Sequence, residues 1–170
     1  MKIEDPLAYS FFMPDELYLL SNDKVVFDNI IASPQPVTKE KVLPVNYSYL
    51  GGHQKKFLIV VHYPEHDFIA DRHFIALQSI LNRLKFTVED VAIFNRAKHP
   101  DAEFAALLNF FKPEKLLLLG KESLPAGIET PELNKIKKLT DFPLLFSYSF
   151  EDMMDNQVNK KLFWDQIKLL

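Results

Sequence analysis

Four short apolar runs, separated by segments with helix signals, constrain the fold of this chain more than any other feature. Each run has four or five residues and is dominated by aliphatic and aromatic side chains, which is typical of strands buried on both faces of a sheet. Strands that alternate with helices predict a mostly parallel sheet covered by helices on both faces. The predicted strands are Phe57–Val61, Val91–Phe94, Leu116–Leu119 and Leu144–Tyr148.

The segments between these runs carry the signals of helix ends and of apolar helix faces. Asp71 is expected to cap one helix and Asp101 to open a second, and Thr87–Asp90 resembles a capping box with Asp in place of Glu. Further helices are predicted at Glu132–Leu139 and Val158–Leu169. In the first two helices, apolar residues recur at the spacings that an amphipathic helix requires: Phe74, Leu77, Leu81 and Leu84 in one, and Phe104, Leu107, Leu108 and Phe111 in the other.

Two regions of the chain differ in their pattern of apolar residues and prolines. Residues 1–53 form an N-terminal segment of short apolar pieces separated by prolines, in which we expect a short helix after Pro14 and a strand near Lys24–Ile31. Residues 54–170 carry the alternation of strands and helices and are expected to form one α/β domain. The predicted fold is a three-layer α/β/α domain with a short, mainly parallel central sheet.

Composition restricts the functions that such a chain can have. Cysteine is absent from the 170 residues, which excludes disulfides, thiol catalysis and an iron–sulfur cluster, and fits a cytoplasmic location. We expect no signal peptide, and the longest apolar runs are too short to span a membrane. Only four glycines are present and none belongs to a phosphate-binding loop, so the sequence predicts no cofactor.

The formal net charge of −3 opposes binding to the phosphate backbone of DNA, because nonspecific binding depends on neutralising phosphates with basic residues. Lysines are scattered or occur in small clusters, such as Lys55–Lys56 and Lys160–Lys161. DNA binding is therefore expected to be weak or indirect.

Histidines after the first predicted strand are possible metal ligands, but their position in a loop argues against a metal site. His62 and His66 lie in a loop that contains Pro64, so they lack the helical geometry of a zinc-binding pair. We expect the neighbouring carboxylates to be solvated loop residues, and no metal site is predicted.

Several local sequences, taken in order, resemble the motifs of the uracil-DNA glycosylase superfamily. The loop after the first strand keeps a proline, Pro64, while His62 stands where the iron–sulfur branch has an acid. Asn95 ends the second strand, as the resembled motif does. After the last strand, Ser149-Phe150-Glu151 replaces the His-Pro-Ser of the last motif. The resemblance implies a glycosylase-like fold with a vestigial pocket at His62, Pro64, Asn95 and Ser149 and with no catalytic residue.

The segment Asn156–Asp165 looks like the closing helix of the psi subunits of bacterial DNA polymerase III, a non-catalytic branch with the same general fold. Psi subunits link the clamp loader to single-stranded-DNA-binding protein through the chi subunit, and their N-terminal segment contacts the clamp loader. The resemblance implies a protein partner, namely a clamp-loader or chi-like subunit. The expected contact residues lie in the N-terminal segment: Phe11, Phe12, Tyr18, Leu19 and Leu20.

These features predict a protein–protein adaptor in a replication or repair assembly rather than an enzyme. The alternative is a DNA-binding or weakly active uracil-DNA glycosylase relative in which His62 acts as the base. A third interpretation is a scaffold unrelated to DNA. A basic cleft beside Pro64 and Ser149 would favour the glycosylase relative, whereas an exposed apolar patch near the N-terminus would favour the adaptor.

Overall fold

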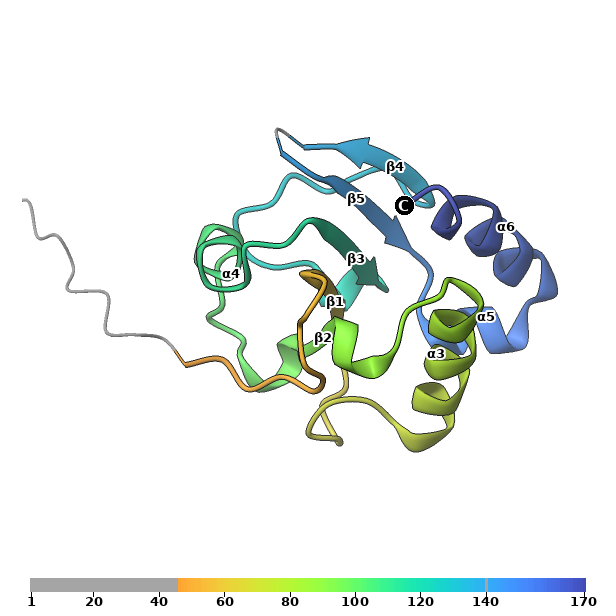
Figure 1. Ribbon diagram of the computed structural model, residues 1–170, viewed down its shortest axis with the longest axis horizontal. Helices are drawn as coiled ribbons and strands as arrows, with labels where there is room; N and C mark the ends of the chain where they lie inside the picture. Colours follow the sequence, from red (N-terminus) through yellow and green to blue (C-terminus); the bar gives the residue numbers. More distant parts are fainter. Residues whose placement is uncertain (1–45, 140) are drawn as a thin grey trace, which may run out of the picture. The chain divides into compact units, whose positions relative to one another are not determined.

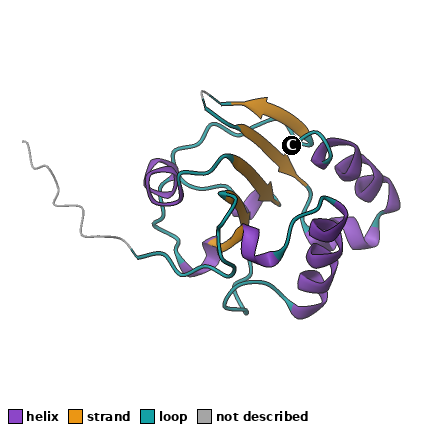
Figure 2. Cartoon of the chain, in the orientation of Figure 1, coloured by secondary structure: helices purple, strands orange, loops and turns teal. Residues whose placement is uncertain are grey.

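The computed structural model describes residues 46–139 and 141–170, which form a five-stranded sheet with helices on both faces (Figure 1, Figure 2). The strand order is β2-β1-β3-β5-β4, and β4 alone runs antiparallel to its neighbour. The strands are β1 (Phe57–Val61), β2 (Val91–Asn95), β3 (Lys115–Leu119), β4 (Lys135–Lys138) and β5 (Pro143–Ser147).

Within the described residues, four α-helices cover the two faces of this sheet. Figure 1 shows α3, α5 and α6 on one side and α4 on the other. Short 3-10 turns, η1 to η3, follow or precede the strands. The bounds are α3 (Asp71–Arg83), α4 (Phe104–Phe111), α5 (Phe150–Asp155), α6 (Gln157–Ile167), η1 (Val88–Asp90), η2 (Arg96–Lys98) and η3 (Lys121–Ser123).

The central strands are buried on both faces because their alternate side chains enter two separate cores. In β1, Phe57, Ile59 and Val61 pack in the core beneath α3, α5 and α6, which also contains Leu77 and Phe163. Leu58 and Val60 face the opposite core, which α4 covers with Leu107 and Phe111. The predicted α/β class, with a mostly parallel sheet and helices on both faces, is confirmed.

The strand order places a topological switch point between β1 and β3. The chain leaves β1 through α3 to reach β2 on one side, then crosses back through α4 to β3 on the other side. The loops after β1 and β3 therefore diverge at their carboxyl ends. A cleft forms at this position in open α/β sheets, which makes it the expected ligand position.

The edge beside β2 is partly covered by the segment that precedes β1. Leu50 and Ile93 exchange backbone hydrogen bonds of 2.9 and 2.8 Å, and the His53 amide donates to the Val91 carbonyl. Gly51 permits this close approach, because it has a φ of 108° and a side chain there would collide with the Val91 carbonyl. Tyr47 precedes this segment and is only 6% exposed in the α4-side core.

One predicted helix is wrong. Glu132–Leu139 was expected to be helical, but Lys135–Lys138 forms the edge strand β4, which pairs with β5. Only Ile136 of this strand packs against the core, while its three lysines are exposed. The good helix formers of this segment are overridden by pairing with β5, and the lysines suit an edge that must not pair further.

Two helix starts also differ from the prediction. Ala70, rather than Asp71, is the N-cap of α3, and Asp71 is the first helical residue. The second helix begins at Phe104 rather than at Asp101, because Asp101 lies in a turn and Glu103, the N-cap, is extended and forms a bridge with Ala126. The predicted strands match β1, β2, β3 and β5 to within one residue at every end.

The capping box at Thr87 is confirmed, since the Thr87 amide donates to Asp90 Oδ2 over 2.8 Å. The predicted short helix after Pro14 and the strand near Lys24–Ile31 lie outside the described residues. Within the part that is described, none of the helices combines the length and the hydrophobicity required to cross a lipid bilayer.

Candidate functional site

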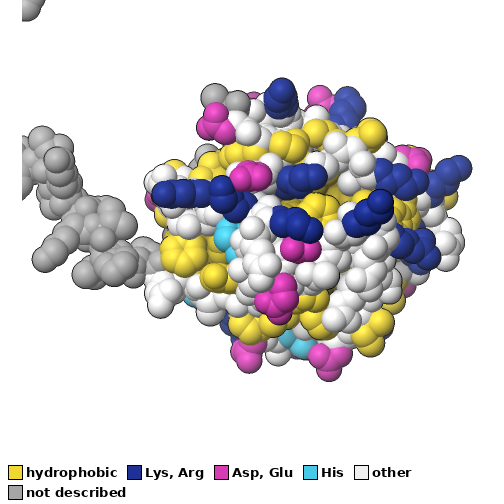
Figure 3. Space-filling view, in the orientation of Figure 1, with side chains coloured by type: hydrophobic (Ala, Val, Ile, Leu, Met, Phe, Trp, Pro, Cys, Tyr) yellow, Lys and Arg dark blue, Asp and Glu magenta, His cyan; other side chains and the backbone are white. Residues whose placement is uncertain are grey.

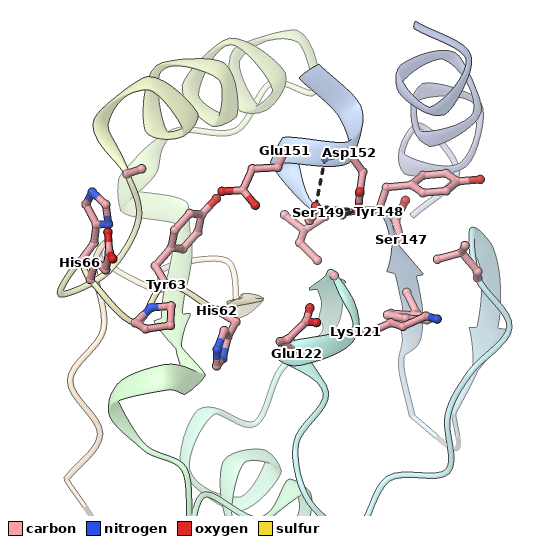
Figure 4. Close-up of a pocket in the computed structure, with 17 residues that line it drawn as sticks. His62, Tyr63, His66, Lys121, Glu122, Ser147, Tyr148, Ser149, Glu151 and Asp152 are labelled. Carbon is pink, nitrogen blue, oxygen red and sulfur yellow. Dashed lines mark hydrogen bonds between the residues drawn. The ribbon is translucent and has the colours of Figure 1, made fainter. Parts of the chain in front are cut away.

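A cleft of about 710 Å³ opens at the carboxyl ends of β1, β3 and β5, at the switch point of the sheet (Figure 4). The loops that follow these three strands form its walls. Its volume falls within the range of small-molecule sites, about 300–1,000 Å³. The lining residues are His62–His66, Ala70, Leu119–Glu122, Leu133, Phe146–Ser149, Glu151 and Asp152.

Asn95 holds the loop that carries the first wall of the cleft. Its side chain is buried, at 1% exposure, and Oδ1 accepts from the Tyr63 amide at 2.9 Å and the Ala97 amide at 3.1 Å. Nδ2 donates toward the carbonyls of Tyr63, His66 and Asp67 at 2.8, 2.8 and 3.2 Å. Asn95 therefore fixes the shape of the loop from below and does not line the cleft.

Ser149 is the N-cap of α5, and its hydroxyl is fully engaged in that role. Its Oγ donates to Asp152 Oδ2 at 2.7 Å and accepts from the Asp152 amide at 3.1 Å, and Figure 4 shows this pairing at the cleft. The Ser149 amide completes the capping box at 3.3 Å to Asp152 Oδ2. Both of these hydrogen bonds stay within the first turn of α5, which is the bonding expected of a helix N-cap.

Gly120 brings the β3 and β5 loops together at the floor of the cleft. Its φ is 84°, and a Cβ at this position would lie 3.2 Å from the Ser149 Cβ. Its amide donates to the Ser147 carbonyl at 3.0 Å. The glycine that ends the third apolar run therefore serves a close approach between two loops.

A chain of polar side chains behind the cleft was not predicted. Tyr63 Oη lies 2.8 Å from His73 Nδ1, and Arg72 Nε donates to His73 Nε2 at 3.1 Å. Because the guanidinium is always a donor, Nε2 must be unprotonated, and Nδ1–H donates to Tyr63 Oη. The Tyr63 hydroxyl hydrogen is then free, and Figure 4 shows the ring extending toward Glu151 at the cleft.

Burial lowers the pKa of His73, and the neighbouring Arg72 lowers it further. Burial and, secondly, the Glu151 carboxylate raise the pKa of Tyr63. Both groups are therefore neutral at physiological pH and act as hydrogen-bonding groups rather than as charges. A sequence signal existed for His73, which interrupts the otherwise apolar face of α3 that Leu77 and Leu81 continue.

Carboxylates outnumber basic side chains around the cleft. Its lining includes one lysine, Lys121, whereas the acidic residues are Glu65, Glu122, Glu151 and Asp152. His62 and His66 also line it, and His62 Nδ1 has no hydrogen-bond partner among the described residues. The cleft is thus not the basic cleft that would favour a nucleic-acid substrate.

The structure brings three of the four predicted pocket residues to the cleft, namely His62, Pro64 and Ser149, while Asn95 lies beneath its loop. The predicted partner-binding residues Phe11, Phe12, Tyr18, Leu19 and Leu20 lie outside the described residues. Within the described ranges, no three His, Asp or Glu side chains are grouped closely enough to hold a metal ion.

The fold and the site define a mostly parallel α/β protein with an acidic cleft at the carboxyl ends of its strands. No protein-family model matches the chain, and no curated protein matches it significantly.

Proposed function

We propose that this chain is a non-catalytic protein of the uracil-DNA glycosylase-like fold that acts as a protein–protein adaptor in a replication or repair assembly. The resemblance to psi subunits suggests a clamp-loader or chi-like subunit as its partner. In this proposal the protein acts by binding other proteins through its surface, and not through chemistry in the cleft. No cofactor or metal takes part in it.

The observation that carries the proposal is the capping role of Ser149. In the resembled enzymes a histidine occupies this place after the last strand. Here the position holds a hydroxyl that is bound to the Asp152 carboxylate and cannot carry the positive charge of an imidazolium. This bonding of Ser149 supports the proposal that the position caps a helix and takes no part in catalysis.

The charge of the cleft supports the same proposal. A glycosylase must hold a flipped base and the flanking phosphates of DNA. Glu122, Glu151 and Asp152 line the cleft and would repel those phosphates, and Lys121 is outnumbered by carboxylates among the lining residues.

The test has two parts. Purified protein is incubated with single- and double-stranded DNA that contains uracil, and the DNA is expected to remain intact. The tagged protein is then recovered from its native cells and its partners are identified by mass spectrometry, with clamp-loader or other replication and repair subunits expected. Recovery of no such subunit would reject the adaptor function.

The second candidate is a weakly active glycosylase relative that uses His62 as a base. The observation in its favour is that His62 lines the cleft with Nδ1 unpartnered among the described residues, and Figure 4 shows its ring at the cleft wall. Excision of uracil that disappears in a His62→Ala variant would establish this candidate and overturn the first.

A further inference from the structure

A second hollow, of about 240 Å³, lies on the opposite side of α5 from the cleft residues, between α3 and α6. Its lining is mainly apolar and includes both methionines of α5, Met153 and Met154. Met154 is 40% exposed, although it is apolar. The other lining residues are Ala76, Ser79, Ile80, Arg83, Phe150, Lys160, Phe163 and Trp164. We call this hollow the α3–α6 groove.

The rim of the α3–α6 groove is basic. Arg83 and Lys160 are its charged lining residues, and no carboxylate lines it. The Arg83 guanidinium lies 5.4 Å from the centre of the Trp164 ring, which holds this charge over the groove. Figure 3 shows basic side chains spread in a band across this face, some of them on the α6 side beside apolar surface. The groove therefore differs in charge from the acidic cleft.

The volume of the groove indicates which kind of ligand it can hold. It is smaller than the sites that enclose whole small molecules, about 300–1,000 Å³, but it has room for one or two apolar side chains. Methionines adapt to differently shaped side chains, and they are common on surfaces that bind helical peptides. An anchor side chain from another protein therefore fits the groove better than a free metabolite.

The charge of the rim indicates which binding partner the groove favours. In a twofold contact that places one groove directly against the groove of a second copy, Arg83 and Lys160 would meet like charges. A segment with acidic residues around its apolar anchor would instead complement the rim. DNA would meet the two cations, but the apolar interior of the groove would remain without a suitable contact.

We propose that the α3–α6 groove binds an acidic amphipathic helical segment of a partner protein. This inference rests on the proposed adaptor function and names the surface and the chemistry of the contact. The partner's apolar side chains enter between α3 and α6, and its carboxylates face Arg83 and Lys160.

A displayed peptide library tests the proposal on the full chain. The library consists of helical peptides of about 15 residues with apolar residues at i, i+4 and i+7. All remaining positions are varied among Glu, Lys and Ser. Selection on the wild-type protein is expected to enrich Glu over Lys. Enrichment of Lys, or no enriched peptide, would overturn the proposal.

The best selected peptide is then measured by fluorescence anisotropy against matched variants. Ser79→Glu and Lys160→Glu each place a negative charge at the groove and should weaken binding by about tenfold or more, as like-charge contacts do. Asn82→Glu on α3 and Lys161→Glu on α6 make the same changes outside the groove lining, and should alter binding much less. Equal effects of groove and control variants would refute the site.

Three controls separate the possible failures. Circular dichroism melts check that each variant is folded, and Ser79 and Asn82 are both exposed, so neither change fills the core. Competition by single-stranded DNA at physiological salt would show a nucleic-acid surface instead. If wild type and Ser79→Glu recover the same native partners, the groove inference fails while the adaptor function stands, whereas recovery of no partner by wild type rejects the adaptor function itself.

Discussion

The replacement Asn95→Asp is the sharpest test of how the cleft is built. Asp has nearly the same shape as Asn, but it substitutes an oxygen for the Nδ2 group, whose two hydrogens are shared among three backbone carbonyls. At neutral pH the variant would place a carboxylate against these carbonyl oxygens in a site that is 1% exposed. The wild-type amide satisfies them, so the change affects the loop that carries the cleft wall.

The expected cost follows from the lost contacts. Each hydrogen bond contributes about 1 kcal/mol net, and a buried group left unpaired costs about 1–3 kcal/mol. Loss of the Nδ2 donors should therefore lower the free energy of unfolding by about 3 kcal/mol at pH 7, before any cost of burying charge. Against a typical total of about 5–15 kcal/mol, this loss is easily measured.

The pH dependence gives a second, independent signature. Burial and the facing carbonyl oxygens would raise the pKa of the introduced carboxyl above its unfolded value of about 3.9. The protonated acid can donate to one of the carbonyls, so the variant should approach wild-type stability as the pH falls toward about 4. The deficit should grow as the pH rises above that value and level off beyond the raised pKa.

Urea denaturation followed by circular dichroism, at several pH values, measures the difference between variant and wild type. Asn82→Asp makes the same chemical change on the exposed surface of α3 and should show almost no deficit. An Asn95→Asp protein as stable as wild type at pH 7 would refute the hydrogen-bond arrangement that we describe beneath the loop.

Three further predictions concern the core, the polar chain and the helix cap. Tyr47→Ala should lower the free energy of unfolding by about 3–5 kcal/mol, because its ring packs among the aromatic side chains of the α4-side core; a urea midpoint like that of wild type would contradict this. Because the folded pKa of His73 is lowered, His73 should stabilise the fold fully above its unfolded value of 6.5 and lose that contribution as the pH falls through 6.5 toward the lower folded pKa. His73→Gln should flatten this part of the stability–pH curve, and an unchanged curve would count against the buried Tyr63–His73 pair. Ser149→Ala should cost about 1 kcal/mol through the lost cap without creating or removing DNA binding, which anisotropy should place weaker than about 10 μM in both proteins.

Much of the site could be predicted from the sequence, because the apolar runs show where the buried strands end. His62, Pro64 and Ser149 follow apolar runs that could only be buried strands, and parallel strands bring such positions to one edge of the sheet. The Ser149–Asp152 capping box is also a local signal, with Ser three residues before Asp, although we predicted only the similar box at Thr87.

The sequence by itself determined the features that depend on neighbouring residues: the buried strands, the two capping boxes and the amphipathic faces of α3 and α4. Tertiary structure alone decided the rest. Lys135–Lys138 became a strand because β5 offered backbone partners. Asn95 became a loop anchor because the carbonyls of a loop about 30 residues earlier surround its amide. Such outcomes depend on groups far apart in the chain, and no local pattern records which of them will meet.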